Sequence, residues 1–342
     1  MILVLHGAIK NVGDFLIKDR GLALLQHLVP DESFMLHQRW QPLDHSMAQE
    51  ARAIVLCGGP GLAADFYPGK FRLVENMAGL ETPILPLALG WAGKGSMESF
   101  RFTYESRNAL ETIHQRIGWS SVRDDLSLEV MARAAVGEVW RTGCNVWYHL
   151  PSLGTPLHRP DRIRRLVFTT PADMRNTPEV LRVLRYLARR YRSADRRCVF
   201  HRGIRSDEYT SKKTAAANRV IAFTAAHLGF DIVDASFDPA TIDFYAESDL
   251  HVGYRVHAHL DFLSLRRPSI LISEDGRGRG QSATLHDPYD LRARQSGLID
   301  RLDMALATEE SGFLASTRAV DEIERSWPRM RQTIHQLVAL KR

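Results

Sequence analysis

Short apolar runs alternate with longer amphipathic stretches along the whole chain, and this rhythm predicts strands that alternate with helices. The stretch that opens at Asp14 repeats apolar residues at helical spacing, and several apolar runs end in glycine-containing turns. Strands that finish in such turns before helices indicate a parallel, doubly wound sheet, which binds ligands beyond the carboxyl ends of its strands. For the first half we predict strands at 2–5, 53–56, 84–89 and 120–122 and helices at 14–28, 107–117 and 127–135.

A break in this rhythm lies at residues 151–160, where three prolines and a glycine leave little periodicity. We interpret this stretch as a linker between an N-terminal α/β domain at 1–152 and a C-terminal α/β domain at 161–342. The predicted fold class is therefore α/β, with two doubly wound, Rossmann-like domains that face each other across a cleft. In the second domain we predict strands at 166–168, 198–200, 231–233, 250–252 and 269–272, helices at 178–193, 212–228 and 256–266, and terminal helices near 287–307 and 317–340.

The composition is that of an ordinary globular protein with a slightly basic balance. Of the 342 residues, 44% are hydrophobic and 25% are charged, so a stable core needs no disulfide or metal. The three cysteines are far apart and odd in number, which argues against a disulfide framework or a zinc site, and no metal or cofactor is predicted. The 45 basic residues against 40 acidic ones suit an anionic substrate, nucleic acid or an anionic membrane surface, without choosing among them.

The sequence contains no recognisable targeting or membrane-spanning segment. Its apolar start is too short for a signal peptide, and no stretch approaches the ~20 apolar residues of a membrane span. We therefore expect a soluble, cytoplasmic protein that does not bind nucleic acid, since no such module is recognisable. The arginine-rich segment 182–205 is predicted to form the solvated face of a helix, and peripheral association with the inner face of a membrane stays an alternative.

The segment 251–259 (HVGYRVHAH) carries the candidate chemistry. A buried strand is predicted to end at Gly253, directly before a helix whose unpaired N–H groups and macrodipole attract anions. Arg255 is placed to bind a phosphate at this helix start, and His257 to act as general acid once a phosphate dianion favours its protonated form. On the residues alone, a purely structural role for both is equally compatible. His251 and His259 are expected to be structural.

Four segments resemble motifs of the polysaccharide pyruvyl transferase family in order and spacing. Residues 11–14 (NVGD) are similar to its N-terminal Asn-x-Gly-Asp, and residues 57–61 (CGGPG) look like its glycine-rich turn. Residues 121–127 (SVRDDLS) resemble its Val-Arg-Asp-x-x-Ser stretch, and residues 253–258 (GYRVHA) its Arg-x-His-Ala segment. The resemblance spans about residues 1–275.

Two places depart from the family's pattern. Cys57 stands where the family often has glycine, and Pro60 interrupts the glycine run. The loop 274–280 is rich in arginine where a segment with a lysine is expected. These departures affect the donor end of the predicted cleft.

This resemblance implies a GT-B-like fold and an enzyme of polysaccharide or exopolysaccharide biosynthesis. Such an enzyme transfers the enolpyruvyl part of phosphoenolpyruvate onto two hydroxyls of a sugar, forms a pyruvate ketal and releases phosphate. Phosphoenolpyruvate is then a co-substrate on the C-terminal side of the cleft, and the acceptor is a sugar or glycan precursor, lipid-linked ones included, on the N-terminal side. A GT-B glycosyltransferase with a nucleotide-sugar donor and a non-catalytic protein that binds anionic ligands remain the alternatives.

Within that reaction, Arg255 is predicted to clamp the phosphate and His257 to deliver a proton to the methylene carbon. His201 and Arg202, just past a predicted strand, are predicted to hold the carboxylate. Asp14 is a candidate base for the sugar hydroxyl, although capping of its own helix is the favoured interpretation. The remaining predicted substrate-binding residues are Asn11, Gly59 and Arg277.

Other conspicuous residues are interpreted as structural. Arg123 and Asp124 are expected to form an ion pair at a strand end. The glycines of 276–280 do not match a dinucleotide fingerprint and are expected in a solvated loop. The tryptophans expected to pack in the core, rather than to stack on sugar rings, are Trp91, Trp119, Trp140 and Trp147.

Overall fold

The computed structural model describes residues 1–91, 93 and 95–340, and its first domain is built on a parallel sheet. The elements of this domain are β1 (Ile2–His6), α1 (Val12–Leu28), β2 (Phe34–Gln38), α2 (His45–Glu50), β3 (Ala53–Cys57), β4 (Ile84–Leu87), α3 (Tyr104–His114), β5 (Ser120–Val122), α4 (Asp125–Ala134) and β6 (Val139–Arg141). The sheet has the order β2-β1-β3-β4, with β5 and β6 paired beside it. Every strand predicted here is present. Three elements were not predicted from the sequence. They are β2, an edge strand that is only partly buried, and the short elements α2 and β6.

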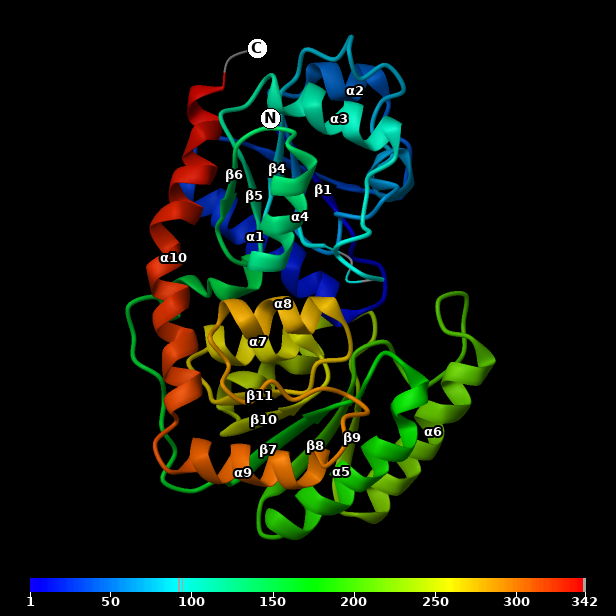
Figure 1. Cartoon of the computed structure of the whole chain (residues 1–342), viewed down its shortest axis with the longest axis vertical. Helices are drawn as coiled ribbons and strands as arrows, with labels where there is room; N and C mark the ends of the chain where they lie inside the picture. Colours follow the sequence, from blue (N-terminus) through cyan, green and yellow to red (C-terminus); the bar gives the residue numbers. More distant parts are fainter. Residues whose placement is uncertain (92, 94, 341–342) are drawn as a thin grey trace.

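The second domain repeats this architecture with five parallel strands in the order β11-β10-β7-β8-β9. Its elements are β7 (Arg165–Thr169), α5 (Thr177–Arg190), β8 (Asp195–Phe200), α6 (Lys212–His227), β9 (Phe230–Asp234), β10 (Leu250–Gly253), α7 (Val256–Ser264), β11 (Ser269–Leu271), α8 (Gly276–Thr284), α9 (Leu298–Glu310) and α10 (Leu314–Ala339). The α/β class with two parallel, doubly wound sheets is therefore confirmed. Figure 1 shows the two sheets one above the other, with α7 and α8 between them.

One prediction for the end of the chain is wrong, and the bounds of another are shifted. The glycines of 276–280 lie in α8 and not in a solvated loop, because Asp275 accepts a hydrogen bond from Arg277 N (2.9 Å) and starts the helix. The terminal helix predicted near 287–307 is present as α9, but it begins only at Leu298 and ends at Glu310.

The apolar core is continuous between the two domains. Leu24 of α1 and Val55 of β3 belong to the same buried cluster as Leu260 and Phe262 of α7. A second cluster, which includes Phe168, fills the other face of the second sheet against α5 and α9. The domains are thus packed closely along α7.

Several polar contacts also join the two domains. Arg20 of α1 forms an ion pair with Asp261 of α7 at 3.0 Å. Trp147 donates from its ring nitrogen to the side chain of Gln281 in α8 at 2.9 Å. Trp147 and Trp91 are buried, as predicted. Trp119 and Trp140 are only partly buried, and their rings stack on each other with centroids 4.1 Å apart.

Helix α10 returns from the second domain to the first and runs along both (Figure 1). It packs against α1 and β4 as well as α7 and α9. We retain the division at 151–160 as a proposal, with α10 as a second connection across it. None of the helices in the described part of the chain is long and apolar enough to cross a membrane.

Candidate active site

A small pocket opens where the carboxyl ends of the strands of both domains meet. Its cavity has a volume of about 40 Å³. Of the predicted site residues, the pocket brings together Asn11, His201, Arg255, His257 and Arg277. The other lining residues are Arg123, Ala172, Tyr254, Val256 and Glu274.

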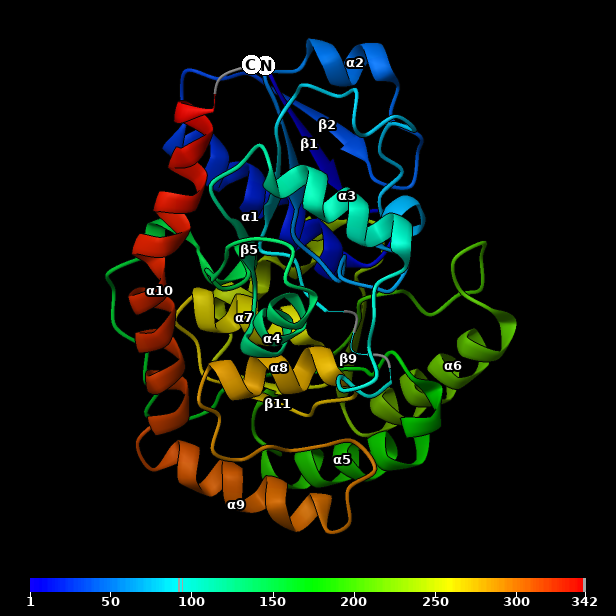
Figure 2. The same ribbon diagram turned by 45° about the horizontal axis from the view of Figure 1, so that its top comes forward.

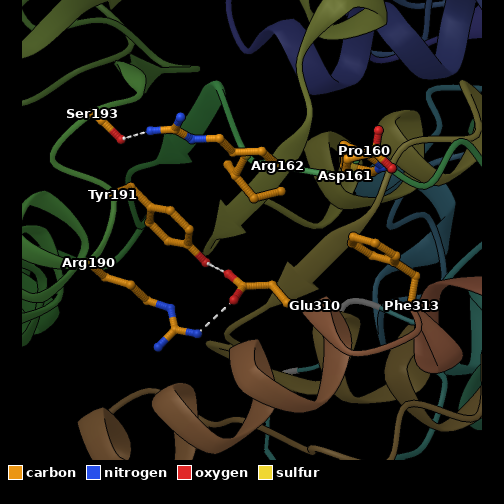
Figure 3. Close-up of a pocket in the computed structure, with 9 residues that line it drawn as sticks. Pro160, Asp161, Arg162, Arg190, Tyr191, Ser193, Glu310 and Phe313 are labelled. Atoms are coloured by element: carbon orange, nitrogen blue, oxygen red, sulfur yellow. Dashed lines mark hydrogen bonds and ion pairs between the residues drawn. The ribbon is translucent and has the colours of Figure 1, made fainter.

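A larger hollow of about 280 Å³ lies far along the second domain, beside Glu310. Its acidic side chain is already occupied, since Tyr191 donates to Glu310 and Arg190 binds the same carboxylate at 2.8 Å (Figure 3). Size alone therefore does not identify the functional site, and the smaller pocket has the reactive groups.

Three helices begin at the small pocket. Asn11 directly precedes α1, Arg255 directly precedes α7, and Arg277 lies in the first turn of α8. Neither Asn11 nor Arg255 uses its side chain to cap its own helix. Because each helix N-terminus carries a partial positive charge of roughly half a unit, the backbone alone makes this pocket attractive to anions.

Arg255 is fixed by the backbone of the segment after β7. Its guanidinium donates from Nε to Thr170 O (2.8 Å) and from Nη2 to Pro171 O (2.9 Å). It forms no ion pair with any carboxylate of the described residues. Burial lowers its pKa to about 10, and the charge of Glu274 opposes this shift. Arg255 is therefore cationic at neutral pH, held in place and available to an anionic ligand.

His257 lies in the first turn of α7 with only 9% of its surface exposed. Its Nε2 atom is buried and has no hydrogen-bond partner among the described residues. Burial, followed by the charges of Arg123, Arg277 and Arg255, lowers its pKa to about 3. The imidazole is thus neutral in the free protein, and a bound anion is needed to favour its protonated form.

Arg123 lines the pocket, although the sequence predicted only a structural role for it. Its predicted ion pair with Asp124 is confirmed, at 3.0 Å from Nε, and Nη2 donates to Trp91 O at 3.2 Å. Its third nitrogen, Nη1, is buried without a partner in the described chain, as is Oδ1 of Asn11. The ion pair uses only part of the guanidinium, and Arg123 also lines the pocket.

Arg277 and Glu274 also line the pocket. Arg277 is paired with Asp275, with Nη2 and Oδ2 at 2.6 Å. Burial by itself lowers the pKa of Arg277, but the hydrogen bonds and charge of Asp275 outweigh it and raise the pKa. Glu274 accepts from the backbone N–H groups of Ala172 (2.7 Å) and Asp173 (2.9 Å), so it holds the segment after β7 and is not a free acid.

His201 and Arg202 have different positions from those expected for a pair of carboxylate ligands. His201 lines the pocket, but burial and then the charge of Arg255 lower its pKa well below the usual value. It shares a hydrogen bond of 2.9 Å with the hydroxyl of Tyr245. Arg202 is exposed, donates to Tyr209 O and does not line the pocket. A neutral His201 offers a hydrogen bond and no charge.

Asp14 and Gly59 lie on the side of the first domain, outside the pocket lining. The expectation that Asp14 caps its helix is wrong, because α1 begins at Val12 and the N-cap position is Asn11. Asn11 instead donates to Asp14 through its side-chain amide at 3.1 Å. Burial raises the pKa of Asp14, while this bond and the charge of Arg39 oppose the rise. Gly59 has a φ of +79°, which glycine adopts without strain.

No arrangement of three or more His, Cys, Asp or Glu side chains suited to a metal ion occurs among residues 1–91, 93 and 95–340. The expected structural histidines form a buried chain of hydrogen bonds. Ser269 Oγ lies 2.8 Å from His251 Nδ1 and 2.7 Å from His259 Nδ1. These two rings stabilise the sheet edge behind α7 and do not reach the pocket.

Comparison with known proteins gives one match to a family model and several to solved structures. The model described as polysaccharide pyruvyl transferase matches residues 11–276 of this chain. No curated protein matches the chain.

The matching solved structures cover almost the entire chain at low identity. The co-structure of MnaA from S. aureus with UDP has a TM-score of 0.57 at 10% identity, covering 99% of this chain and 97% of that one. UDP-GlcNAc 2-epimerase from Neisseria meningitidis, bound to UDP-GlcNAc, has a TM-score of 0.55 at 8% identity (98% and 99% coverage). Sucrose-phosphate synthase from Thermosynechococcus elongatus has a TM-score of 0.54 at 11% identity, covering 99% of this chain and 98% of that one. The shared feature is the GT-B-like fold, as predicted.

Proposed function

The chain belongs to the polysaccharide pyruvyl transferase family, and on this premise we propose that it transfers the enolpyruvyl group of phosphoenolpyruvate to a sugar of a polysaccharide or glycan precursor. The product is a pyruvate ketal, and phosphate is released. The observation that supports this most directly is the convergence of Arg123, Arg255 and Arg277 with three helix N-termini on one small pocket. Phosphoenolpyruvate, a small molecule with a phosphate and a carboxylate, suits such a pocket.

We assign the phosphate to Arg255 and the start of α7. The two backbone carbonyls that hold this guanidinium leave its remaining N–H groups for a ligand. Arg123 Nη1, which lacks a partner among the described residues, and the charge of Arg277 serve the carboxylate, with His201 as a neutral donor. This arrangement replaces the earlier pairing of His201 with Arg202, since Arg202 lies outside the lining.

Protonation of the donor starts the reaction. His257 lines the pocket, its Nε2 has no partner among the described residues, and it is our candidate acid for the methylene carbon. As that carbon becomes a methyl group, the neighbouring carbon becomes cationic and open to a sugar hydroxyl. Binding of the anionic donor raises the pKa of His257 from its low value in the free protein, so proton uptake is coupled to donor binding.

Two hydroxyls of the acceptor complete the ketal. The first adds to the cationic carbon, and Asp14 is our candidate base for its proton. The second forms the other C–O bond as the C–O bond to phosphate breaks with its electron pair. One hydroxyl proton restores the acid and the other leaves with the phosphate, so the reaction balances without an oxidant or an added cofactor.

The acceptor is assigned to the first domain, where Asp14 and Gly59 lie at the ends of α1 and β3. Exposed arginines on α5, among them Arg182, Arg185 and Arg189, form the solvated face that the sequence predicted. We keep peripheral contact with an anionic membrane as part of the proposal, since such a face suits lipid-linked acceptors in the cytoplasm.

The deciding experiment is incubation of the pure protein with phosphoenolpyruvate and a panel of galactosides, mannosides and glucosamine derivatives. We expect an acceptor whose mass increases by one pyruvate ketal, with an equal amount of phosphate released. A protein that releases phosphate with no acceptor, or that forms no adduct with any of them, contradicts the proposal.

The second candidate is a GT-B glycosyltransferase with a nucleotide-sugar donor. It is favoured by the similarity to structures that contain UDP or UDP-GlcNAc. The same acceptor panel with UDP-glucose and UDP-GlcNAc separates the two candidates, because only the second releases UDP.

A further inference from the structure

Arg39 is a buried cation at the edge of the first sheet. It follows β2 directly, and its backbone N–H donates to His6 O at 2.9 Å, at the carboxyl end of β1. These two strands run side by side from the top of the molecule towards the second domain (Figure 2). Its guanidinium carbon lies 4.2 Å from the centre of the Trp40 ring and 5.4 Å from that of Phe71. The aromatic rings therefore fix the orientation of the guanidinium.

The charge of Arg39 lacks the compensation that other buried arginines have. Arg123 and Arg266 are similarly buried, and each has an ion pair, with Asp124 and Glu324 respectively. Arg39 is 6% exposed, yet its guanidinium has no ion pair and no hydrogen bond to any residue that the structure describes, and its Nε is buried. An unpaired buried cation is costly to the fold, which indicates that a ligand supplies the missing anion.

The nearest candidate counter-ion does not fill this role. Burial lowers the pKa of Arg39, and the charge of Asp14 opposes that shift, so the two groups sense each other. Their distance exceeds the 4.0 Å of an ion pair in this structure. Burial also raises the pKa of Asp14 itself.

Two glycines border the guanidinium of Arg39. A Cβ atom at Gly7 would lie 3.0 Å from Arg39 Nε, and one at Gly59 would lie 3.7 Å from Nη1. Gly7 follows β1 and Gly59 follows β3, so both lie at the carboxyl end of the sheet. Because neither position has a side chain, the guanidinium lies close to the backbone at the sheet edge where open α/β sheets bind their substrates.

From these observations we propose that Arg39 binds an anionic group of the acceptor sugar. This inference rests on the proposed function and names its acceptor class. The group is a carboxylate or a phosphate, as in a uronic acid or a sugar phosphate. It belongs to the acceptor because Arg39 does not line the donor pocket, and because Asp14, the candidate base, senses the charge of Arg39 and accepts a hydrogen bond from Asn11 of that pocket.

Calorimetric binding of sugars to the full-length protein, without phosphoenolpyruvate, tests this assignment. The probes are galactose, glucose and mannose, each as the neutral sugar, the uronate and the 1-phosphate. We expect at least one anionic form to bind roughly ten to a hundred times more tightly than its neutral sugar, as for other bidentate arginine contacts. A preference for uronates alone identifies a carboxylate, and a preference for 1-phosphates alone a phosphate.

Variants separate this subsite from the donor pocket. Arg39→Met should abolish the preference for the anionic sugar and leave the affinity for phosphoenolpyruvate unchanged. Arg255→Ala should do the reverse. Equal binding of neutral and anionic sugars in all three series overturns the proposal, and so does a loss of phosphoenolpyruvate affinity in Arg39→Met. These binding results do not depend on turnover, so a protein that never releases phosphate from phosphoenolpyruvate still gives them.

Thermal unfolding of the free protein gives an independent result. If Arg39 is kept for a ligand, Arg39→Met removes an uncompensated charge and should keep or raise the melting temperature. Arg266→Met, which leaves Glu324 without its partner, is the matched control and should lower it. A clear loss of stability in Arg39→Met would indicate a structural role instead.

Discussion

Arg255, His257 and Arg123 contribute different properties to the pocket. Arg255 supplies a charge that backbone carbonyls hold in position without neutralising it. His257 supplies a neutral ring with an atom that no described residue binds. Arg123 forms an ion pair with Asp124 through Nε and also lines the cavity. These differences let each residue be tested separately.

Replacement of Arg255 tests donor binding. Arg255→Ala should weaken binding of phosphoenolpyruvate and reduce kcat/KM roughly a hundredfold or more, because a charge-assisted phosphate contact is lost. Steady-state kinetics with calorimetric binding of phosphoenolpyruvate measure both. Arg185→Ala, on the exposed face of α5, is the control and should behave like wild type. Unchanged donor affinity in Arg255→Ala would remove this residue from the donor site.

Replacement of His257 tests proton transfer. Asparagine keeps a polar group in the cavity but delivers no proton, so His257→Asn should retain donor affinity while kcat falls roughly 10²–10⁴-fold. Single-turnover rates at saturating phosphoenolpyruvate measure this. His259→Asn, two residues along the same helix and outside the pocket, should keep kcat within a few-fold. A wild-type rate in His257→Asn would exclude it as the acid.

Arg123 can be tested without loss of its charge. Lysine keeps one cation near Asp124 but has a single nitrogen, so it does not serve the ion pair and a ligand together. Arg123→Lys should raise KM for phosphoenolpyruvate roughly tenfold or more. Asp124→Asn, which weakens the pair and leaves the arginine in place, should affect the melting temperature more than KM. If KM responds only to Asp124→Asn, Arg123 is structural.

At the scale of elements, α1, α7 and α8 are arranged with their N-termini at one cavity although they come from different domains. Close packing of α1 on α7 makes this possible. A Cβ atom at Gly13 would lie 2.9 Å from His257 Nδ1, so glycine in the first turn of α1 lets the histidine lie against that helix. The NVGD motif therefore positions a residue of the other domain.

A pair of glycines on α1 tests this contact. Gly13→Ala should reduce kcat roughly tenfold or more, because the added methyl displaces His257 and misplaced catalytic groups lose rate steeply. Gly21→Ala, whose Cβ would lie 2.4 Å from Cys57 Sγ in the core, should lower the melting temperature and leave kcat of the folded protein unchanged. The opposite pattern, in circular dichroism melts and kinetics, would contradict the contact.

At the scale of the whole molecule, the two domains share one core, and histidines are buried at their junction. The pKa is lowered to about 3 for both His257 and His259, with burial as the main cause. Since the unfolded chain binds these protons near pH 6.5 and the folded protein does not, protonation favours unfolding. This contribution is absent above pH 6.5 and destabilises the protein as the pH falls towards 3.

The comparison of wild type with His259→Asn measures the contribution of His259 alone to the pH dependence of stability. At pH 7.5 the variant should be less stable, because its hydrogen bond to Ser269 is altered. Below pH 6.5 this deficit should shrink by roughly 1.4 kcal/mol per pH unit, since only wild type retains the unfavourable histidine. Urea unfolding between pH 7.5 and 5 measures the difference. The exposed His227→Asn is the control, and a deficit independent of pH would contradict the assignment.

The sequence by itself determined the α/β rhythm, nearly all the strands, and a cluster around Arg255 and His257. This was possible because strand and helix periods are local and because parallel sheets bind ligands at their carboxyl ends. Tertiary structure decided what depends on distant partners. The unpaired nitrogen of Arg123, the exclusion of Arg202 from the pocket and the isolation of Arg39 follow from burial and packing between segments far apart in the chain. The glycine-rich start of α8 likewise became helical through its cap at Asp275 and close packing on Gly93, which local propensity opposes.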